Sequence, residues 1–252
     1  MEKALQEKSK GILTFGGAYS NHILAAAYAG KKAGLQSIGI IRGESPALLS
    51  PTLQDAQELG MKLIFMEREI FRKMKNDQAG LEIDFPDFTI IPEGGYGITG
   101  MLGASTIYDL IPKSRYNWIL CACGTGTMMA GLLHASSPEE KVMGIPVLKD
   151  YTNMEKEIRS LLPPEDQTKN IFLDHSYHFG GYAKKTGELI YFMNSFYQSY
   201  GIPTDFIYTG KLMFALSDLI QKGFFSNGSR ILAIHSGGLQ GNRSLKKGIL
   251  AF

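Results

Sequence analysis

Residues 20–22, Ser-Asn-His, are polar side chains placed between an apolar stretch and a run typical of a helix. Residues 12–17 end that stretch in two glycines, which predicts a buried strand followed by a tight turn. The following run predicts a helix that Ser20 or Asn21 caps and Gly34 stops. Backbone N–H groups and the positive end of a helix dipole meet at such a start, which favours an anionic ligand. An ordinary capped turn explains the same residues and is the commoner case when the local sequence is judged alone.

A second candidate is the loop at residues 124–127 (GTGT), which follows the apolar stretch 118–122 and precedes a predicted helix at 128–134. Small residues allow backbone N–H groups to approach a phosphate, and the two hydroxyls add donors. The loop is neither a Walker loop nor a G-x-G-x-x-G fingerprint, because Met129 occupies the third glycine position and no Gly-Lys follows. A plain tight turn explains the loop equally well.

Three further residues carry groups that catalysis can use. Ser236 begins a Ser-Gly-Gly turn after the predicted strand 230–235, and its hydroxyl is a candidate partner for a ligand heteroatom. Tyr208 follows the strand-like residues 204–207, and Tyr182 follows two glycines. A tyrosine acts as an acid or base when a cation lowers its pKa. Turns without ligands, and tyrosines that only pack, are the commoner interpretations.

The composition excludes several classes of function. A formal net charge of +2 gives no electrostatic reason to expect nucleic acid or an anionic membrane surface as a partner. No apolar run is long enough to cross a bilayer, and the charged residues 1–11 have no signal-peptide core. Cys121 and Cys123 are too close in sequence for an ordinary disulfide, which predicts reduced thiols in a cytoplasmic protein. They lack a second cysteine pair, and His175 and His178 lack further ligands, so no metal site is predicted.

Short apolar runs alternate with helical stretches along most of the 252 residues. This alternation predicts βαβ units and hence an α/β protein with parallel sheets. One segment departs from the alternation: residues 76–87 are polar and irregular, which indicates a crossing between two domains.

Six short motifs, considered together, resemble one family: the pyridoxal-phosphate (PLP) enzymes of the 1-aminocyclopropane-1-carboxylate (ACC) deaminase and D-cysteine desulfhydrase group. They occur in the family's order and cover nearly the whole chain. Each motif alone is weak, but six in order are specific. The motifs are GGAYSNH at 16–22, PEGG at 92–95, GTGT at 124–127, GGY at 180–182, YTGK at 208–211 and HSGG at 235–238.

The resemblance implies the two-domain fold of tryptophan-synthase β-like enzymes, fold type II, in which parallel sheets are flanked by helices. It divides the chain into a remnant of an N-terminal helix at 1–10, a smaller α/β domain at 11–91 and a larger cofactor-binding α/β domain at 92–252. The cofactor, pyridoxal 5'-phosphate, is expected in the cleft at the C-terminal ends of the strands.

The resemblance also assigns roles to matching residues. The implied catalytic residues are Ser20, Tyr182 and Tyr208, and the implied cofactor-binding residues are Asn21, Gly124, Thr125, Gly126, Thr127 and Ser236. The loop 124–127 resembles the phosphate cradle, Asn21 the partner of the cofactor's phenolic oxygen, and Ser20 a nucleophile or proton carrier. Ser236 falls where a residue faces the pyridine nitrogen, and a hydroxyl there would leave that nitrogen largely unprotonated.

The implied reaction removes the amino group from a small amino acid and gives a 2-keto acid and ammonia by elimination and hydrolysis. It is either a D-cysteine desulfhydrase-like β-elimination or an ACC deaminase-like ring opening, so lyase and hydrolase both describe the expectation. Thr209 replaces the glutamate usual in the deaminases proper, which favours the desulfhydrase branch. A homodimeric cytoplasmic enzyme is expected, with no nucleic-acid or membrane partner.

One departure from the family pattern leaves an alternative open. The family's Schiff-base lysine lies in a Gly-Asn-Lys motif upstream of the segment that matches 16–22, and this sequence contains no Gly-Asn-Lys. The chain therefore resembles a family member without its N-terminal segment. The alternative to an enzyme is a non-catalytic fragment or pseudoenzyme, and Lys10 and Lys211 are the first residues to test as replacement holders of the cofactor.

Overall fold

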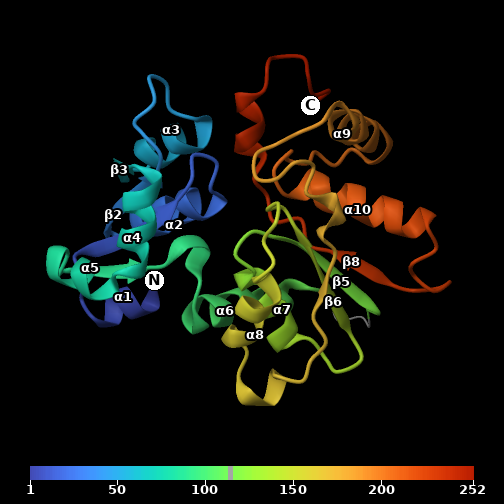
Figure 1. Cartoon of the computed structure of the whole chain (residues 1–252), viewed down its shortest axis with the longest axis horizontal. Helices are drawn as coiled ribbons and strands as arrows, with labels where there is room; N and C mark the ends of the chain where they lie inside the picture. Colours follow the sequence, from blue (N-terminus) through green and yellow to red (C-terminus); the bar gives the residue numbers. More distant parts are fainter. Residues whose placement is uncertain (113–115) are drawn as a thin grey trace. The chain divides into compact units, whose positions relative to one another are not determined.

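The computed structural model describes residues 1–112 and 116–252, and the chain divides into two compact units (Figure 1). Unit 1 comprises Met1–Gly95 and unit 2 comprises Tyr96–Phe252. The domain boundary expected from the sequence, between residues 91 and 92, lies a few residues before this division.

Unit 1 is built on a sheet of four parallel strands in the order β3-β2-β1-β4. The strands are β1 (Gly11–Gly16), β2 (Gln36–Arg42), β3 (Lys62–Met66) and β4 (Phe88–Ile91). The helices are α1 (Glu2–Gln6), α2 (Asn21–Ala33), α3 (Pro51–Glu58), α4 (Arg68–Asn76) and α5 (Gln78–Asp84). Residues 1–10, expected as a remnant of an N-terminal helix, contain α1 and belong to this unit.

Alternate residues of β1 enter two separate apolar clusters, so the sheet of unit 1 is covered on both faces. Ile12 belongs to the cluster that α2 and α3 complete with Ile23 and Leu53. Phe15 belongs to the cluster that α4 completes with Phe71. All six residues of β1 are buried, as expected for the centre of a parallel sheet.

The prediction of an irregular crossing at residues 76–87 is wrong. This segment contains α5 and lies within unit 1. The side chain of Asp77 accepts a hydrogen bond from the Gly80 N–H at 3.0 Å and caps the helix, and Leu81 is buried against the sheet. The polar composition concealed a short helix that needs only a cap and one buried anchor residue.

Unit 2 repeats the same architecture with different residues. Its four parallel strands have the order β7-β6-β5-β8: β5 (Trp118–Cys123), β6 (Lys141–Pro146), β7 (Phe172–Leu173) and β8 (Ile231–Ala233). The helices are α6 (Ile98–Ser105), α7 (Thr127–Ala135), α8 (Met154–Leu161), α9 (Gly187–Tyr200) and α10 (Thr209–Gln221). Ile119 enters the cluster with α7 and α8, and Leu120 the cluster with α10, so helices cover both faces.

The order of strands reverses once in each sheet. In unit 1 the chain moves outward from β1 through β2 to β3 and then returns to place β4 on the other side of β1. In unit 2 it moves from β5 through β6 to β7 and returns to place β8 beside β5. The loops that leave the two strands at such a reversal diverge, which makes these points the usual ligand sites of open parallel sheets. The α/β prediction with parallel sheets flanked by helices is confirmed.

Candidate functional site

Ser20 and Asn21 lie at the strand reversal of unit 1, where β1 ends and α2 begins. The Ser20 hydroxyl accepts a hydrogen bond from the Ile23 N–H at 3.3 Å, and Gly34 ends the helix with a φ of 68°. Both predicted limits of this helix are confirmed. A Cβ on Gly16 would lie 2.8 Å from the Ser20 Oγ, so only glycine at this position leaves room for the serine.

His22 connects this helix start to the end of β4. Its Nε2 lies 2.7 Å from the Thr14 hydroxyl, which in turn donates to the Ile91 carbonyl at 2.8 Å. Because the single hydroxyl proton goes to the carbonyl, the imidazole donates from Nε2 and carries its lone pair on Nδ1. Burial lowers the pKa of His22 to about 4, although the nearby Glu93 carboxylate opposes this shift. His22 is therefore neutral at physiological pH.

The loop between β5 and α7 has the features that a phosphate requires. No side chain caps the first turn of α7, so its backbone N–H groups can donate hydrogen bonds to a ligand placed before the helix. Gly126 has a φ of 81°, and a Cβ there would lie 2.5 Å from the Ile158 Cγ1, so glycine is required. The hydroxyls of Thr125 and Thr127 are 3.0 Å apart. These residues fit the phosphate group of a cofactor.

Tyr208 lies beside this loop in unit 2, and Tyr182 lies beside Tyr208. A Cβ on Gly124 would be 3.5 Å from Tyr208 Cε1 and 3.8 Å from its hydroxyl, so the ring of Tyr208 lies against the glycine. The ring centroids of Tyr182 and Tyr208 are 6.3 Å apart with an edge-to-face orientation. Contacts within unit 2 thus link the loop at residues 124–127, called the glycine loop below, to Tyr208 and through Tyr208 to Tyr182.

Ser236 lies in an exposed turn after β8, followed by Gly237 and Gly238 with φ values of 86° and 94°. Because β8 pairs with β5, this turn and the glycine loop leave neighbouring strands at the same edge of the sheet. Ser236 therefore lies on the loop expected to form the other wall of the ligand site at the reversal.

The prediction that residues 204–207 are strand-like is wrong, because this segment is a turn that caps α10. The fully buried Asp205 carboxylate accepts hydrogen bonds from the N–H groups of Ile207, Tyr208 and Thr209, and from the Thr209 hydroxyl, at 2.7–2.9 Å. Burial raises the pKa of Asp205, and these donors oppose the rise. An aspartate four residues before the helix was the signal for this cap.

The two lysines named as replacement cofactor holders differ in their surroundings. Lys10 is exposed just before β1. Lys211 is fully buried in α10, and its Nζ donates to the carbonyl oxygens of His178 and Gly181, at 2.8 Å in each case. The amine of Lys211 is therefore engaged by the main chain of unit 2.

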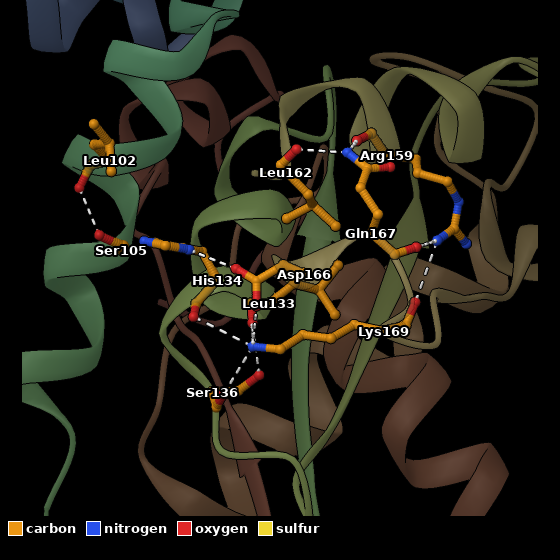
Figure 2. Close-up of polar contacts among 10 residues, drawn as sticks. All are labelled: Leu102, Ser105, Leu133, His134, Ser136, Arg159, Leu162, Asp166, Gln167 and Lys169. Carbon is orange, nitrogen blue, oxygen red and sulfur yellow. Dashed lines mark hydrogen bonds and ion pairs between the residues drawn. The ribbon is translucent and has the colours of Figure 1, made fainter. Parts of the chain in front are cut away.

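The C-terminal end of α7 is fixed by a separate polar cluster (Figure 2). The Lys169 Nζ donates to the carbonyl oxygens of Leu133, His134 and Ser136, which satisfies the last turn of the helix. Asp166 binds both Lys169, at 3.0 Å, and His134 Nδ1, at 2.6 Å. Burial would raise the pKa of Asp166, but these hydrogen bonds outweigh it and lower the pKa. The cluster anchors the helix whose other end forms the glycine loop.

Within residues 1–112 and 116–252, no three His, Cys, Asp or Glu side chains are grouped so as to hold a metal ion. In the same described residues, no helix is long and apolar enough to span a membrane.

Comparison with known proteins identifies the family to which this chain belongs. A family model described as pyridoxal-phosphate dependent enzyme matches residues 1–237. The chain belongs to this family. Its members use PLP, and the uncapped helix start with its glycine loop is the part of this PLP-dependent enzyme that fits the phosphate.

Individual relatives narrow the comparison. A Pyrococcus horikoshii protein, whose name proposes ACC deaminase activity, is 29% identical over 94% of this chain and 77% of its own length. The bifunctional D-cysteine desulfhydrase/ACC deaminase of Arabidopsis thaliana mitochondria is 26% identical over 96% and 67%. A crystal structure of an ACC deaminase homologue superposes with a TM-score of 0.80 at 26% identity, covering 95% of this chain and 77% of that one. The fold is that of fold type II PLP enzymes, and the resemblance inferred from the six motifs is confirmed.

The expected description of the activity as a hydrolase is wrong. The relatives are named as deaminases and a desulfhydrase, which corresponds to lyase chemistry. In such reactions the bond to the leaving group breaks by elimination, and water enters only afterwards. The relatives' names also favour an enzyme over the non-catalytic alternative.

Proposed function

We propose that this PLP-dependent enzyme removes the amino group from a small amino acid and releases a 2-keto acid and ammonia. The favoured reaction is β-elimination from a D-amino acid of the D-cysteine type, with opening of the ACC ring as the second candidate. One observation carries the proposal: the glycine loop, the uncapped start of α7 and Tyr208 meet at the strand reversal of unit 2.

Residues of the chain are assigned to the cofactor as follows. Gly124, Thr125, Gly126 and Thr127 bind the phosphate through backbone N–H groups and hydroxyls. The Ser236 hydroxyl is assigned to the pyridine nitrogen, and the Asn21 amide to the phenolic oxygen, on the resemblance of their motifs. When bound, the cofactor supplies an electron sink for charge that develops on the substrate's Cα. A neutral hydroxyl at the pyridine nitrogen tempers that sink, which suits elimination.

Three hydroxyl groups are assigned to the substrate. Tyr182 and Tyr208, whose rings meet edge to face, orient the substrate and exchange protons with the leaving group. Ser20 is assigned as nucleophile or proton carrier. Its oxygen caps α2, so the backbone of the helix start fixes its position.

The quaternary state and the compartment belong to the proposal as well. We infer a homodimer, because dimers are usual in the family that the six motifs resemble. A cytoplasmic location is supported by Cys121 and Cys123, which are buried free thiols of the kind kept reduced in that compartment.

Cofactor binding and product formation test the proposal together. PLP is titrated into the protein and binding is followed by absorbance, and then keto acid, ammonia and sulfide are measured from D-cysteine and from ACC. Thr125→Val removes one phosphate donor at nearly constant volume and should weaken PLP binding about tenfold, the effect of one charge-assisted hydrogen bond. Thr106→Val is the matched control, because the exposed Thr106 hydroxyl donates to the Gly103 carbonyl in the same unit. Equal PLP affinity of all three proteins would contradict the assignment of the loop.

Thr209 is the residue whose identity favours the desulfhydrase branch over the deaminases proper. This residue is fully buried, and its hydroxyl both donates to the Asp205 carboxylate and accepts from the Asp205 N–H. A glutamate here would place a second carboxylate against a buried first one, so Thr209→Glu would disturb the fold rather than switch the substrate. The decisive measurement is therefore kcat/KM of the unaltered enzyme on both substrates, and a higher value for ACC would overturn the preference for elimination.

A further inference from the structure

Lys211 makes an interaction that the proposed chemistry does not use. Its side chain is fully buried, and the Nζ donates to two carbonyl oxygens, of His178 and of Gly181, both at 2.8 Å. A buried ammonium is costly unless hydrogen bonds replace its water. Both acceptors belong to one turn, residues 178–183, which is called the 178–183 turn and carries Tyr182.

The 178–183 turn has an unfavourable backbone. Phe179 and Ala183 have φ values of 50° and 55°, in the left-handed region that non-glycine residues avoid, and Gly180 and Gly181 have φ values of 89° and 111°. Such conformations persist only where surrounding contacts enforce them. Within the turn, the Gly180 N–H donates to the His178 imidazole at 2.9 Å. The turn is joined to α10 by the hydrogen bonds of the Lys211 amine, and by the edge-to-face packing of Phe179 on Phe214 with ring centroids 4.8 Å apart.

Tyr208, the other tyrosine, is held at the start of α10. Asp205 accepts a hydrogen bond from the Tyr208 N–H at 2.9 Å. Burial lowers the pKa of Lys211 to about 8, and the charge of the Asp205 carboxylate opposes this shift. Asp205 thus sets the backbone of Tyr208, while Lys211 sets the turn that carries Tyr182. The rings of Tyr182 and Tyr208 meet edge to face, with their centroids 6.3 Å apart.

We propose that Lys211 is a positioning residue that holds the 178–183 turn, and with it Tyr182, in the conformation that places the ring beside Tyr208. The effect on the turn is a property of the fold alone. The effect on turnover rests on the proposed function, in which both tyrosines serve the substrate.

The test compares Lys211→Met with Lys222→Met. Lys222 lies at the exposed end of the same helix and pairs with Asp218 at 2.5 Å, so it is the matched control. Amide hydrogen exchange of the 178–183 turn should become at least tenfold faster in Lys211→Met, with exchange in β5 and α7 unchanged. The kcat should fall at least tenfold, whereas PLP affinity should change less than twofold because the glycine loop is intact. Lys222→Met should match the unaltered protein in all three measurements.

A second variant separates positioning from general stability. Ala183→Gly removes the left-handed strain at that residue. The double variant Lys211→Met, Ala183→Gly should therefore recover part of the lost exchange protection and kcat. If Lys211→Met lowered only the stability of the whole protein, a change confined to the turn would not restore them. Should Lys211→Met not fold, Lys211→Gln is measured by the same criteria, because its amide nitrogen is one bond nearer the backbone than the Lys211 Nζ and cannot keep both hydrogen bonds.

The outcomes distinguish this inference from the proposed function. Faster exchange in the turn of a protein that shows no PLP-dependent turnover supports the positioning role and rejects the proposed function. Unchanged exchange in the turn, together with unchanged kcat in an active enzyme, overturns the positioning role and leaves the proposed function standing.

Discussion

At the scale of single residues, His22 shows how a polar side chain near a proposed site is held in one protonation state. Its Nε2 donates to the Thr14 hydroxyl, and Gly95 lies close to the other side of the ring, where a Cβ would be 3.6 Å from the His22 Cε1. The motifs at 16–22 and 92–95 are therefore joined through this imidazole within unit 1. No function could be assigned to His22 from the sequence, because Ile91 and Gly95, to which it is linked in the fold, are far from it along the chain.

His22 should make the protein less stable in acid. Its pKa is about 4 in the folded state and 6.5 in the unfolded chain, so the unfolded state binds the proton first. The free energy of unfolding should therefore fall as the pH is lowered from about 6.5 to 4, by about 1–2 kcal/mol for this partly buried group. His22→Gln keeps an N–H donor for Thr14 but does not titrate. Urea unfolding followed by circular dichroism should show a smaller loss for this variant, and equal losses would contradict the argument.

Lys211 should act in the opposite range of pH. Burial lowers its pKa to about 8, against 10.5 in the unfolded chain, although Asp205 opposes the shift. Between these values the unfolded state holds the proton and the folded state does not, so this residue makes stability rise with pH from about 8 to 10. Replacing Lys211 by Met should remove that rise. Unfolding free energies at pH 8 and 10 measure the difference, and identical pH slopes in both proteins would refute the burial argument.

At the scale of elements, two aspartates that cap helices should differ in their contribution to stability. Asp205 is fully buried at the start of α10, whereas Asp77 caps α5 at the surface. Asp205→Ala leaves buried N–H groups that water cannot reach and should cost about 2–3 kcal/mol. Asp77→Ala exposes its N–H group to solvent and should cost about 0.5–1 kcal/mol. Thermal unfolding of both variants tests this, and similar losses would show that burial is not the deciding factor.

The elements also show what the sequence can predict and why. The limits of α2 followed from local signals, a serine cap and a glycine stop. The segments 76–87 and 204–207 were predicted wrongly because a single buried side chain, Leu81 or Asp205, decides their structure. Which strands become neighbours depends on contacts between distant residues, so the reversal beside β5 had no local signal. The motifs of the candidate site were visible in the sequence, but the support from Asp205 and Lys211 was not.

At the scale of the whole molecule, one topology occurs twice, and each copy carries family motifs at its strand reversal. If the glycine loop binds phosphate, PLP should stabilise unit 2 at residues 124–130 before any substrate is added. At one hundred times the dissociation constant, binding contributes about 2.7 kcal/mol. Hydrogen exchange with PLP, and with pyridoxal as a control that lacks the phosphate, measures this. Equal protection by the two compounds would count against a phosphate site in the loop.

The positions of one aromatic residue and two thiols limit how the unfolding of this protein can be observed. The only tryptophan, Trp118, is in β5 among Phe172, Phe224 and Phe225, and the only cysteines, Cys121 and Cys123, follow it on the same strand. Contact with Cys123 and burial raise the pKa of Cys121, so its thiol reacts only when the strand opens. Tryptophan fluorescence and thiol labelling therefore both report on unit 2 and give no signal from unit 1. A gap between the fluorescence and circular-dichroism transitions would measure, without any engineered probe, how far the two units unfold independently.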